Sequence, residues 1–429
     1  MIQLSENREY SDKGLSIFDS NMVLPRHRWF QFKEGFSASL VDKAISEFEL
    51  SSGRKPTILD PFSGSGTTLV AAATQGLKAT GIEVNPFLAF ATNAKIVHGR
   101  WRQSVFERSI NTIVRESRNE SASRLEGVST FTESPGASKW LFNRSVLRGF
   151  SAIDAALGHH QAYKAPLRLA LISSLVDCCN AKRDGKCLRY RSDWKTLGFS
   201  SANLRERFVF RAYQMLEDSQ IEPFVPDRII LARGDTRVVL PRMKKVYDLL
   251  VTSPPYLNSF DYSDVYRPEL FVGGFVRDNK QLRRIRLSTV RSHVQASWAK
   301  ATSIVSPMLE PILDQLTQRE DLWDHRLPEM IKAYFEDMKA VLSAAARSMR
   351  AGGQAWIVVS TSAYGGVEIP VDLVIADVAS RCGWNLLGVH VLRSLRSAGQ
   401  QWREFRSGRK PPLRESLIRL ERRKERKAD

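Results

Sequence analysis

The sequence predicts an α/β fold: a doubly wound sheet of seven strands, the last of them antiparallel, together with a helical insertion. Short apolar segments that are typical of buried strands alternate with segments of helical spacing in two separate parts of the chain, 28–99 and 226–424. Between these parts the spacing is helical throughout and no segment resembles a strand, so residues 100–225 are expected to form the insertion. The other expected segments are an N-terminal lead at 1–27, a second insertion at 257–326 and a basic tail at 425–429.

The first part of the predicted sheet is one strand–helix–strand–helix unit. Residues 56–62 (PTILDPF) form a short apolar run, which is followed by a glycine-rich turn and an alanine-rich helix. Thr67 or Thr68 can cap this helix through its side-chain oxygen. A second strand is expected at 77–84, and Asn85, which precedes a proline, suits the start of the next helix.

The second part of the predicted sheet ends in a β-hairpin. No helical segment separates the last two strands, so the final strand is expected to enter the sheet antiparallel to its neighbours. The five strands predicted in this part are 227–235, 246–256, 354–362, 385–395 and 415–424.

Net charge is the unusual feature of the composition. The 429 residues include 64 lysines and arginines against 46 acidic residues, a formal charge of +18. A field of this sign favours a polyanionic partner such as nucleic acid, because binding releases condensed counterions. The opening residues are polar, unlike a signal peptide, and no apolar stretch is long enough to span a membrane, so we expect a cytoplasmic location.

The cysteines predict neither a disulfide framework nor a metal centre. The chain has four of them, Cys178, Cys179, Cys187 and Cys382. They show no C-x-x-C spacing, and we expect buried free thiols. A metal site built from the clustered cysteines with His159 or His160 is the alternative.

The turn after the first strand, DPFSGSGTT at 60–68, predicts a cationic ligand. Gly64 and Gly66 let the backbone turn sharply and approach a ligand closely. Leu69 stands where a dinucleotide fingerprint needs a third glycine, and no lysine follows the last glycine as a phosphate loop requires. Asp60 would repel a pyrophosphate but attract the ammonium and sulfonium groups of S-adenosylmethionine.

Two further acidic residues end predicted strands. Glu83 closes the second strand, where it can accept hydrogen bonds from the two ribose hydroxyls of a nucleoside. Asp235 closes the third, where its carboxylate can accept a hydrogen from the exocyclic amine of adenine. Because carboxyl ends of parallel strands meet at one edge of a sheet, both carboxylates are expected beside the glycine turn.

The sequence TSPPY at 252–256, which ends the fourth strand, predicts chemistry on an amine. Two consecutive prolines remove two N–H donors and leave a rigid stretch that presents carbonyl groups. If the Ser253 side chain and the Pro254 carbonyl each accept one amine hydrogen, the nitrogen lone pair is aimed at the sulfonium methyl for direct transfer. Tyr256 would stack on a base flipped out of the duplex. Methylation at carbon 5 of cytosine is excluded, since it needs a thiolate and no cysteine follows a proline.

These motifs resemble those of a known family, the DNA amino-methyltransferases of restriction-modification type. DPFSGSGTT is similar to the family's cofactor motif, and TSPPY to its catalytic motif (S/N/D)PP(Y/F/W). The resemblance implies a Rossmann-like methyltransferase sheet, S-adenosylmethionine as cofactor, double-stranded DNA as substrate and a cognate restriction nuclease that acts as a separate protein. The cofactor-binding residues that it implies are Asp60, Phe62, Gly64, Gly66, Thr67, Glu83 and Asp235. The catalytic residues that it implies are Ser253, Pro254, Pro255 and Tyr256.

Residues 28–45 also resemble the family's helix motif that precedes the sheet. Phe36 and Ser37 match the aromatic and hydroxyl residues that would close over the methionine end of the cofactor. The serine of TSPPY resembles the cytosine-N4 group, so we expect methylation of the cytosine N4 amine in specific DNA sequences. The alternatives are an adenine-N6 DNA enzyme, an RNA methyltransferase acting on the guanine N2 amine, and an inactive DNA-binding subunit that keeps the fold.

Clusters of basic residues in the two insertions predict the DNA-contacting surface. In each cluster lysines and arginines are interleaved with aromatic residues or lie beside the catalytic turn, as phosphate contact and base reading require. A solvated basic helix face is the simpler explanation. The predicted contacts are Lys182, Arg183, Lys186, Arg189, Arg191, Arg283, Arg284, Arg286 and Arg291. The residues expected to line the base pocket are Asp261, Tyr262, Asp264 and Tyr266.

Overall fold

The computed structural model is built around one large sheet. The structure describes residues 4–5, 10, 13–32, 35–97, 100–128, 130–184, 187–259, 261–295, 303–395 and 413–424. The strands of the large sheet are β1 (Leu4–Ser5), β2 (Thr57–Asp60), β3 (Lys78–Glu83), β6 (Ile229–Arg233), β7 (Tyr247–Thr252), β8 (Met349–Ser360), β11 (Trp384–Ser394) and β12 (Arg414–Arg422). Their order across the sheet is β1-β11-β12-β8-β7-β2-β3-β6. Strands β2, β3, β6, β7 and β8 run parallel, whereas β12 is antiparallel to both β8 and β11.

The predicted seven-stranded sheet with an antiparallel last strand is confirmed, and β1 adds an eighth strand. β1 comes from the N-terminal lead and pairs in parallel with β11, with Leu4 opposite Val389. A two-residue strand is too short to show the apolar alternation by which strands are recognised in a sequence.

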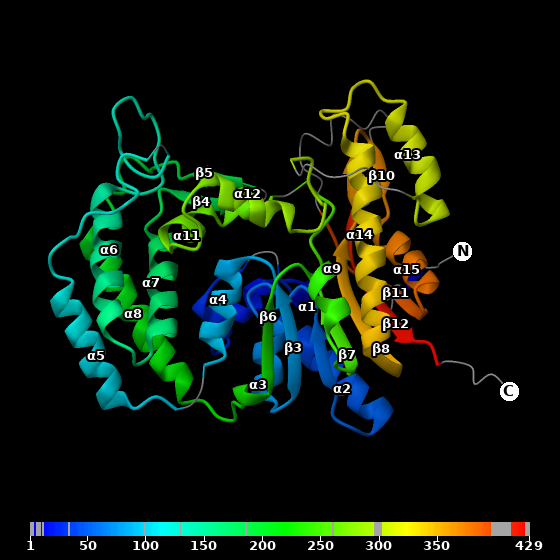
Figure 1. Cartoon of the computed structure of the whole chain (residues 1–429), viewed down its shortest axis with the longest axis horizontal. Coiled ribbons are helices and arrows are strands. Elements are labelled where there is room, and N and C mark those ends of the chain that lie inside the picture. Colours follow the sequence, from blue (N-terminus) through cyan, green and yellow to red (C-terminus); the bar gives the residue numbers. More distant parts are fainter. Residues whose placement is uncertain are drawn as a thin grey trace.

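Helices cover both faces of the sheet (Figure 1). One face is covered by α1 (Lys13–Ser16), α2 (Ala38–Ser52) and α3 (Thr67–Thr74), and the other by α9 (Thr236–Val239), α14 (Leu327–Ser348) and α15 (Val371–Arg381). Helix α13 (Glu310–Thr317) packs on α14. Alternation along β8 fills both interfaces. Trp356 and Val358 pack with α2, while Ile357 and Val359 pack with α14.

The insertion between β3 and β6 forms a helical lobe beside the sheet, at the left of Figure 1. Its helices are α5 (Gln103–Glu116), α6 (Arg144–His159), α7 (Lys164–Asp177) and α8 (Ser201–Ser219), which pack against one another, and α7 also packs on α4 (Pro86–Lys95). The prediction that this segment holds no strand is wrong, because β4 (Ala181–Asp184) and β5 (Cys187–Tyr190) form an antiparallel hairpin. Both strands have only four residues and β4 is mostly polar, so apolar alternation does not reveal the hairpin.

The second insertion, between β7 and β8, bridges the helical lobe and the sheet. Its elements are α10 (Tyr262–Val265), α11 (Arg267–Val272), α12 (Asn279–Leu287), the 3-10 helix η5 (Pro307–Leu309) and α13. Leu270 and Leu282 pack in the core of the helical lobe, whereas Val290 and Leu309 pack with α14. This segment therefore passes over the carboxyl ends of the strands.

The remaining elements are short. They are the hairpin β9 (Ser362–Tyr364) and β10 (Val367–Ile369), and the 3-10 helices η1 (Phe18–Val23), η2 (His27–Trp29), η3 (Pro226–Arg228) and η4 (Leu240–Arg242). In the part of the chain that the structure describes, no helix combines the length and the apolar character needed to cross a membrane.

Candidate functional site

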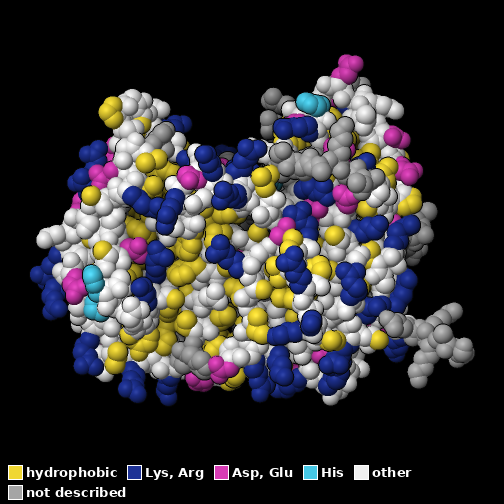
Figure 2. All heavy atoms as spheres, in the orientation of Figure 1, with side chains coloured by type: hydrophobic (Ala, Val, Ile, Leu, Met, Phe, Trp, Pro, Cys, Tyr) yellow, Lys and Arg dark blue, Asp and Glu magenta, His cyan; other side chains and the backbone are white. Residues whose placement is uncertain are grey.

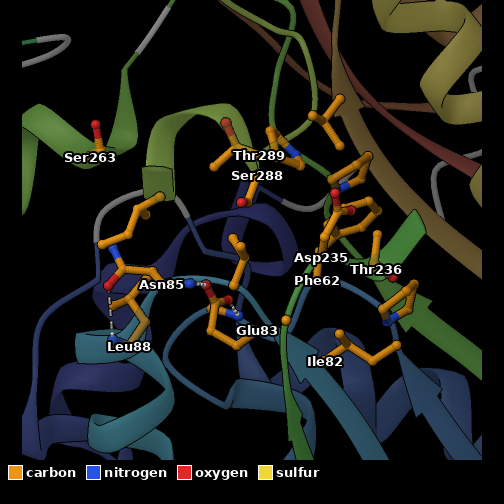
Figure 3. A pocket seen from close by; sticks show the side chains of 18 of the residues that line it. Phe62, Ile82, Glu83, Asn85, Leu88, Asp235, Thr236, Ser263, Ser288 and Thr289 are labelled. Carbon is orange, nitrogen blue, oxygen red and sulfur yellow. Dashed lines mark hydrogen bonds between the residues drawn. The ribbon is translucent and has the colours of Figure 1, made fainter. Parts of the chain in front are cut away.

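A cavity lies at the carboxyl ends of four adjacent strands, β7, β2, β3 and β6. We call the residues at these strand ends the floor; they are Pro61, Phe62, Gly64, Glu83, Val84, Asn85, Gly234, Asp235, Thr236, Ser253, Pro254 and Pro255. We call four residues of the second insertion, Ile285, Ser288, Thr289 and Val290, the roof. Figure 3 shows Ser288 and Thr289 across the cavity from Glu83 and Asn85. The cavity occupies the place where an open α/β sheet binds its ligands.

The glycine turn forms the centre of the floor. Gly64 and Gly66 have φ angles of 51° and 85°, in the left-handed region that favours glycine. A Cβ atom on Gly64 would lie 2.9 Å from the ring of Phe32, another residue of the lining. The prediction that Thr67 or Thr68 caps α3 is wrong, because Gly66 occupies the N-cap position and no side chain caps the helix.

Asp60 lies beneath the turn rather than in the lining. Its Oδ1 accepts hydrogen bonds from the Thr252 hydroxyl at 2.7 Å and from the Phe62 amide at 3.1 Å. Burial raises the pKa of the Asp60 carboxyl to about 6, against the opposing effect of these hydrogen bonds. Asp60 therefore ties the end of β2 to the end of β7, directly before Ser253.

Glu83 is the acidic group of the floor that ends β3. Its Oε2 accepts the Gly64 amide at 2.8 Å and its Oε1 accepts the Asn85 amide at 2.7 Å. Burial raises the pKa of the Glu83 carboxyl to about 8, although these two hydrogen bonds oppose the shift. A carboxylate oxygen can accept two hydrogen bonds, so each oxygen keeps capacity for a hydroxyl group of a ligand.

Asp235 and Thr236 form the part of the floor that follows β6. Asp235 caps α9 by accepting the Arg237 amide, and both of its oxygens also contact the Arg237 guanidinium, with a shortest distance of 2.7 Å. Thr236 Oγ1 is buried and has no hydrogen-bond partner among the described residues. Thr236 as a residue lines the cavity, whereas its hydroxyl oxygen is enclosed by the protein.

Ser253, Pro254 and Pro255 line the cavity, but Tyr256 does not. The Tyr256 hydroxyl donates to Glu415 Oε1 at 2.6 Å, and Arg393 holds the other oxygen of Glu415 at 2.7 Å. The residue predicted to stack on a base is thus anchored to β12 through its hydroxyl group.

The structure does not bring Phe36 and Ser37 into the lining. Phe36 packs in the core between α2 and the sheet, and the Ser37 side chain caps α2 by accepting the Ser39 amide at 3.1 Å. Phe32, four residues earlier, lines the cavity instead and stacks on Tyr266, with ring centroids 5.8 Å apart. The aromatic stretch before α2 was the right signal, but the sequence does not show which ring turns inward.

Of the basic residues predicted to contact DNA, four are exposed: Lys182, Arg189, Arg283 and Arg284. Arg189 forms an exposed ion pair with Asp184 at 2.8 Å. For Lys182, Arg283 and Arg284 the described residues supply no acidic partner. These four side chains remain available to a polyanion.

Four other predicted contacts are used inside the protein. Arg183 pairs with the buried Glu269, and Arg286 with Asp261 at 2.5 Å. Arg291 pairs with Asp337 and Glu336. Arg191 donates a hydrogen bond to the Cys179 carbonyl. Lys186 lies outside the described residues. A basic run in a sequence does not reveal carboxylates that approach it from distant segments.

The expected base-pocket residues divide in a similar way. Tyr266 is fully buried in an aromatic cluster, and Asp264 is exposed. Asp261 is occupied by Arg286, and the side chain of Tyr262 lies outside the described residues. The residue of this segment that lines the cavity is Ser263.

The thiols lie away from the floor. Cys178 is the C-cap residue of α7 and Cys179 follows it, both buried. Burial raises the pKa of these thiols to about 11 and about 12, so both are protonated at neutral pH. Within the described ranges no group of His, Cys, Asp or Glu side chains is arranged to hold a metal ion.

The lining fits S-adenosylmethionine. Glu83 and Asp235 supply acceptors for hydroxyl, amine and cationic groups, while Ile82, Leu88 and Val290 supply apolar walls for a base ring. Gly64, whose φ lies in the left-handed region, leaves no side chain at the centre of this lining.

The family model N6_N4_Mtase, described as DNA methylase, matches residues 4–93, which include the glycine turn and Glu83. The Type II methyltransferase M.AvaI of Nostoc sp. is 28% identical, over 92% of this chain and 90% of the relative. The Type II methyltransferase M.BsoBI of Geobacillus stearothermophilus is 24% identical, over 93% of this chain and 86% of the relative.

Solved structures are more distant. The rRNA methyltransferase aviRa from Streptomyces viridochromogenes is 9% identical and covers 96% of each chain, with a TM-score of 0.31. This value is too low to support a statement about function. The similarity to DNA methyltransferases therefore rests on the sequence relatives and the family model.

Proposed function

Because the chain belongs to the S-adenosylmethionine-dependent DNA methyltransferases of restriction-modification type, we propose that it methylates the exocyclic N4 amine of cytosine in specific sequences of duplex DNA. One observation carries the proposal. Ser253 and Pro254, which can accept amine hydrogens, line the same cavity as Glu83 and Asp235, which can hold the cofactor.

The residues of the cavity have separate roles in this reaction. S-adenosylmethionine supplies an electrophilic methyl group on its sulfonium. Glu83 would accept the ribose hydroxyls, and Asp235 and Thr236 would bind the adenine end. The Ser253 hydroxyl and the Pro254 carbonyl would accept the two amine hydrogens and orient the nitrogen lone pair, while Pro255 keeps the turn rigid. Cytosine must leave the duplex stack to reach this depth.

The choice of cytosine rests on Ser253, the residue type that the cytosine-N4 group resembles at the first position of the motif. The matching family model spans both N6 and N4 chemistry, so adenine N6 is the competing target. The third candidate target, the guanine N2 amine, would require RNA instead of DNA as the substrate.

We assign DNA contact to the exposed cations near the roof. Arg283 and Arg284 lie on α12, which also contributes Ile285 to the roof, and Lys182 and Arg189 lie on the β4–β5 hairpin. Figure 2 shows lysine and arginine side chains gathered around α12, below a notch in the outline between the helical lobe and α13. A duplex seated there would have its phosphates beside these cations.

The test is to identify the methylated base. Unmethylated genomic duplex DNA is incubated with the protein and methyl-labelled S-adenosylmethionine, then hydrolysed to nucleosides. The label is expected in N4-methylcytosine, and an identically purified Ser253→Ala preparation controls for methyltransferases from the expression host. Label in N6-methyladenine would overturn the base assignment, and label in guanine of RNA but not in DNA would overturn the substrate.

A further inference from the structure

A buried carboxylate outside the cavity joins its floor to its roof. Asp337 of α14 is only 4% exposed. Its Oδ2 accepts hydrogen bonds from Arg237 Nη1 at 2.7 Å and from the Arg291 amide at 2.9 Å. Its Oδ1 accepts Arg291 Nη2 at 2.7 Å. One carboxylate thus holds two arginines that belong to different segments.

Arg237 connects Asp337 to the floor. Its guanidinium contacts both oxygens of Asp235, and its Nη2 also donates to the Thr289 carbonyl of the roof at 3.1 Å. Burial lowers the pKa of Arg237, but the hydrogen bonds and charges of Asp235 and Asp337 outweigh burial and raise it above its ordinary value. A change in the position of Asp235 is therefore transmitted to Arg237.

Arg291 connects Asp337 to the roof. It follows Ser288–Val290 directly, and these residues follow the end of α12. Glu336 adds a second contact to the Arg291 guanidinium at 2.8 Å. Because the Arg291 backbone amide is bound as well as its side chain, Asp337 fixes the path of the loop and not only one rotamer.

The charges alternate along this connection: Asp235, Arg237, Asp337, Arg291 and Glu336. Asp337 is buried and its four neighbours are partly buried. Removal of Asp337 would leave Arg237 and Arg291 without their shared partner in a medium of lower dielectric than water. The connection has few ways to rearrange, so its two ends are expected to move together.

We propose that Asp337 is a positioning residue that couples cofactor binding at the floor to DNA binding at α12. Cofactor bound at Asp235 and Thr236 restricts the position of Arg237, which is bonded to Asp337. Asp337 in turn holds Arg291 and the loop after α12, the helix that carries Arg283 and Arg284. By linkage, DNA bound at α12 raises the affinity for the cofactor by the same factor. The inference rests on the proposed function only in taking DNA as the second ligand; it does not depend on which base is methylated.

The test measures the coupling ratio, which is the Kd of a duplex alone divided by its Kd in saturating sinefungin, a cofactor analogue. The duplex is one that the wild type methylates. We expect a ratio of about 10 for the wild type, within the usual range of coupled sites. For Asp337→Asn we expect a ratio near 1, whereas a merely structural role would weaken each Kd and leave the ratio unchanged.

Asp377→Asn is the matched control, since it removes a helix carboxylate paired with Arg381 at 3.0 Å on α15, away from the cavity. Its ratio should equal that of the wild type. A wild-type ratio of 1, an unchanged ratio in Asp337→Asn, or equal loss in both variants would overturn the inference. If Asp337→Asn does not fold by circular dichroism, Arg291→Gln decides by the same outcomes. Failure of the proposed function would appear separately, as absent DNA binding or a different methylated base.

Discussion

The floor and the roof of the cavity are built by different means. In the floor, Glu83 is held by amides 2 and 19 positions away in the chain, within one strand–turn–helix unit. In the roof, the loop before Arg291 is held by Asp337, 46 positions away, and Asp337 is joined to Arg237 across 100 positions. The contacts of Glu83 at the centre of the floor are thus local backbone contacts, whereas the roof depends on side chains that meet only in the folded protein.

Replacing a floor glycine should produce the largest change in cofactor binding. Gly64→Ala puts a side chain at a φ of 51° and places its Cβ 2.9 Å from the Phe32 ring. We expect the sinefungin affinity to fall about 100-fold by calorimetry, or about 2.7 kcal/mol. Gly53→Ala is the control, because Gly53 has a φ of 68° and its Cβ would meet no atom within 4 Å. Equal losses in both variants would show that strain, and not the floor, determines the effect.

This difference in construction also explains what the sequence could predict. The floor residues Gly64, Glu83, Asp235 and Ser253 lie at the ends of strands or within four residues after them, so recognising the strands placed them at one edge of the sheet. Asp60 showed the limit of this reasoning. The position of Asp60 at the end of its strand was predicted correctly. Its side chain, however, lies beneath the glycine turn, where it accepts a hydrogen bond from Thr252 instead of lining the cavity.

The roof could not be predicted in the same way. Arg286 and Arg291 looked like free cations in the sequence, yet Asp261 and Asp337 neutralise them. Phe32 was missed because it lies before α2, outside the strand ends, and its neighbour Phe36 fitted the motif equally well. Such pairings are set by packing between distant segments, and no spacing along the chain reports them.

Removing the exposed cations beside the roof should weaken DNA binding and leave cofactor binding unchanged. For the double variant Arg283→Ala/Arg284→Ala we expect about tenfold lower DNA affinity at low salt. The slope of log Kd against the logarithm of the salt concentration should fall by about 2. Lys55→Ala/Lys78→Ala removes the same charge at the amino ends of β2 and β3, opposite the cavity. If both double variants lower the DNA affinity equally, binding depends on the net charge of the protein and not on the cations beside the roof.

A further predicted effect is a change in how stability depends on pH. The pKa of Glu83 is raised from 4.5 to about 8, so the folded protein holds a proton that the unfolded chain releases above pH 4.5. Stability conferred by this proton is therefore lost as pH rises toward 8, at up to about 1.4 kcal/mol per pH unit. Without cofactor, the wild-type Tm should fall more steeply between pH 6 and 8 than the Tm of Glu83→Gln. Parallel curves for the two proteins would contradict the assignment.

The most direct test of the account separates binding from chemistry at Ser253. In single-turnover experiments with duplex DNA, Ser253→Ala should transfer methyl groups about 100-fold more slowly, because one acceptor for the amine hydrogens is lost. Its Kd for sinefungin should stay within about twofold of the wild type, since Glu83, Asp235 and Thr236 are untouched. Ser263→Ala, which alters another serine of the same lining, should change the rate far less. Equal losses of rate and cofactor affinity in Ser253→Ala would contradict the claim that the floor separates cofactor binding from amine orientation.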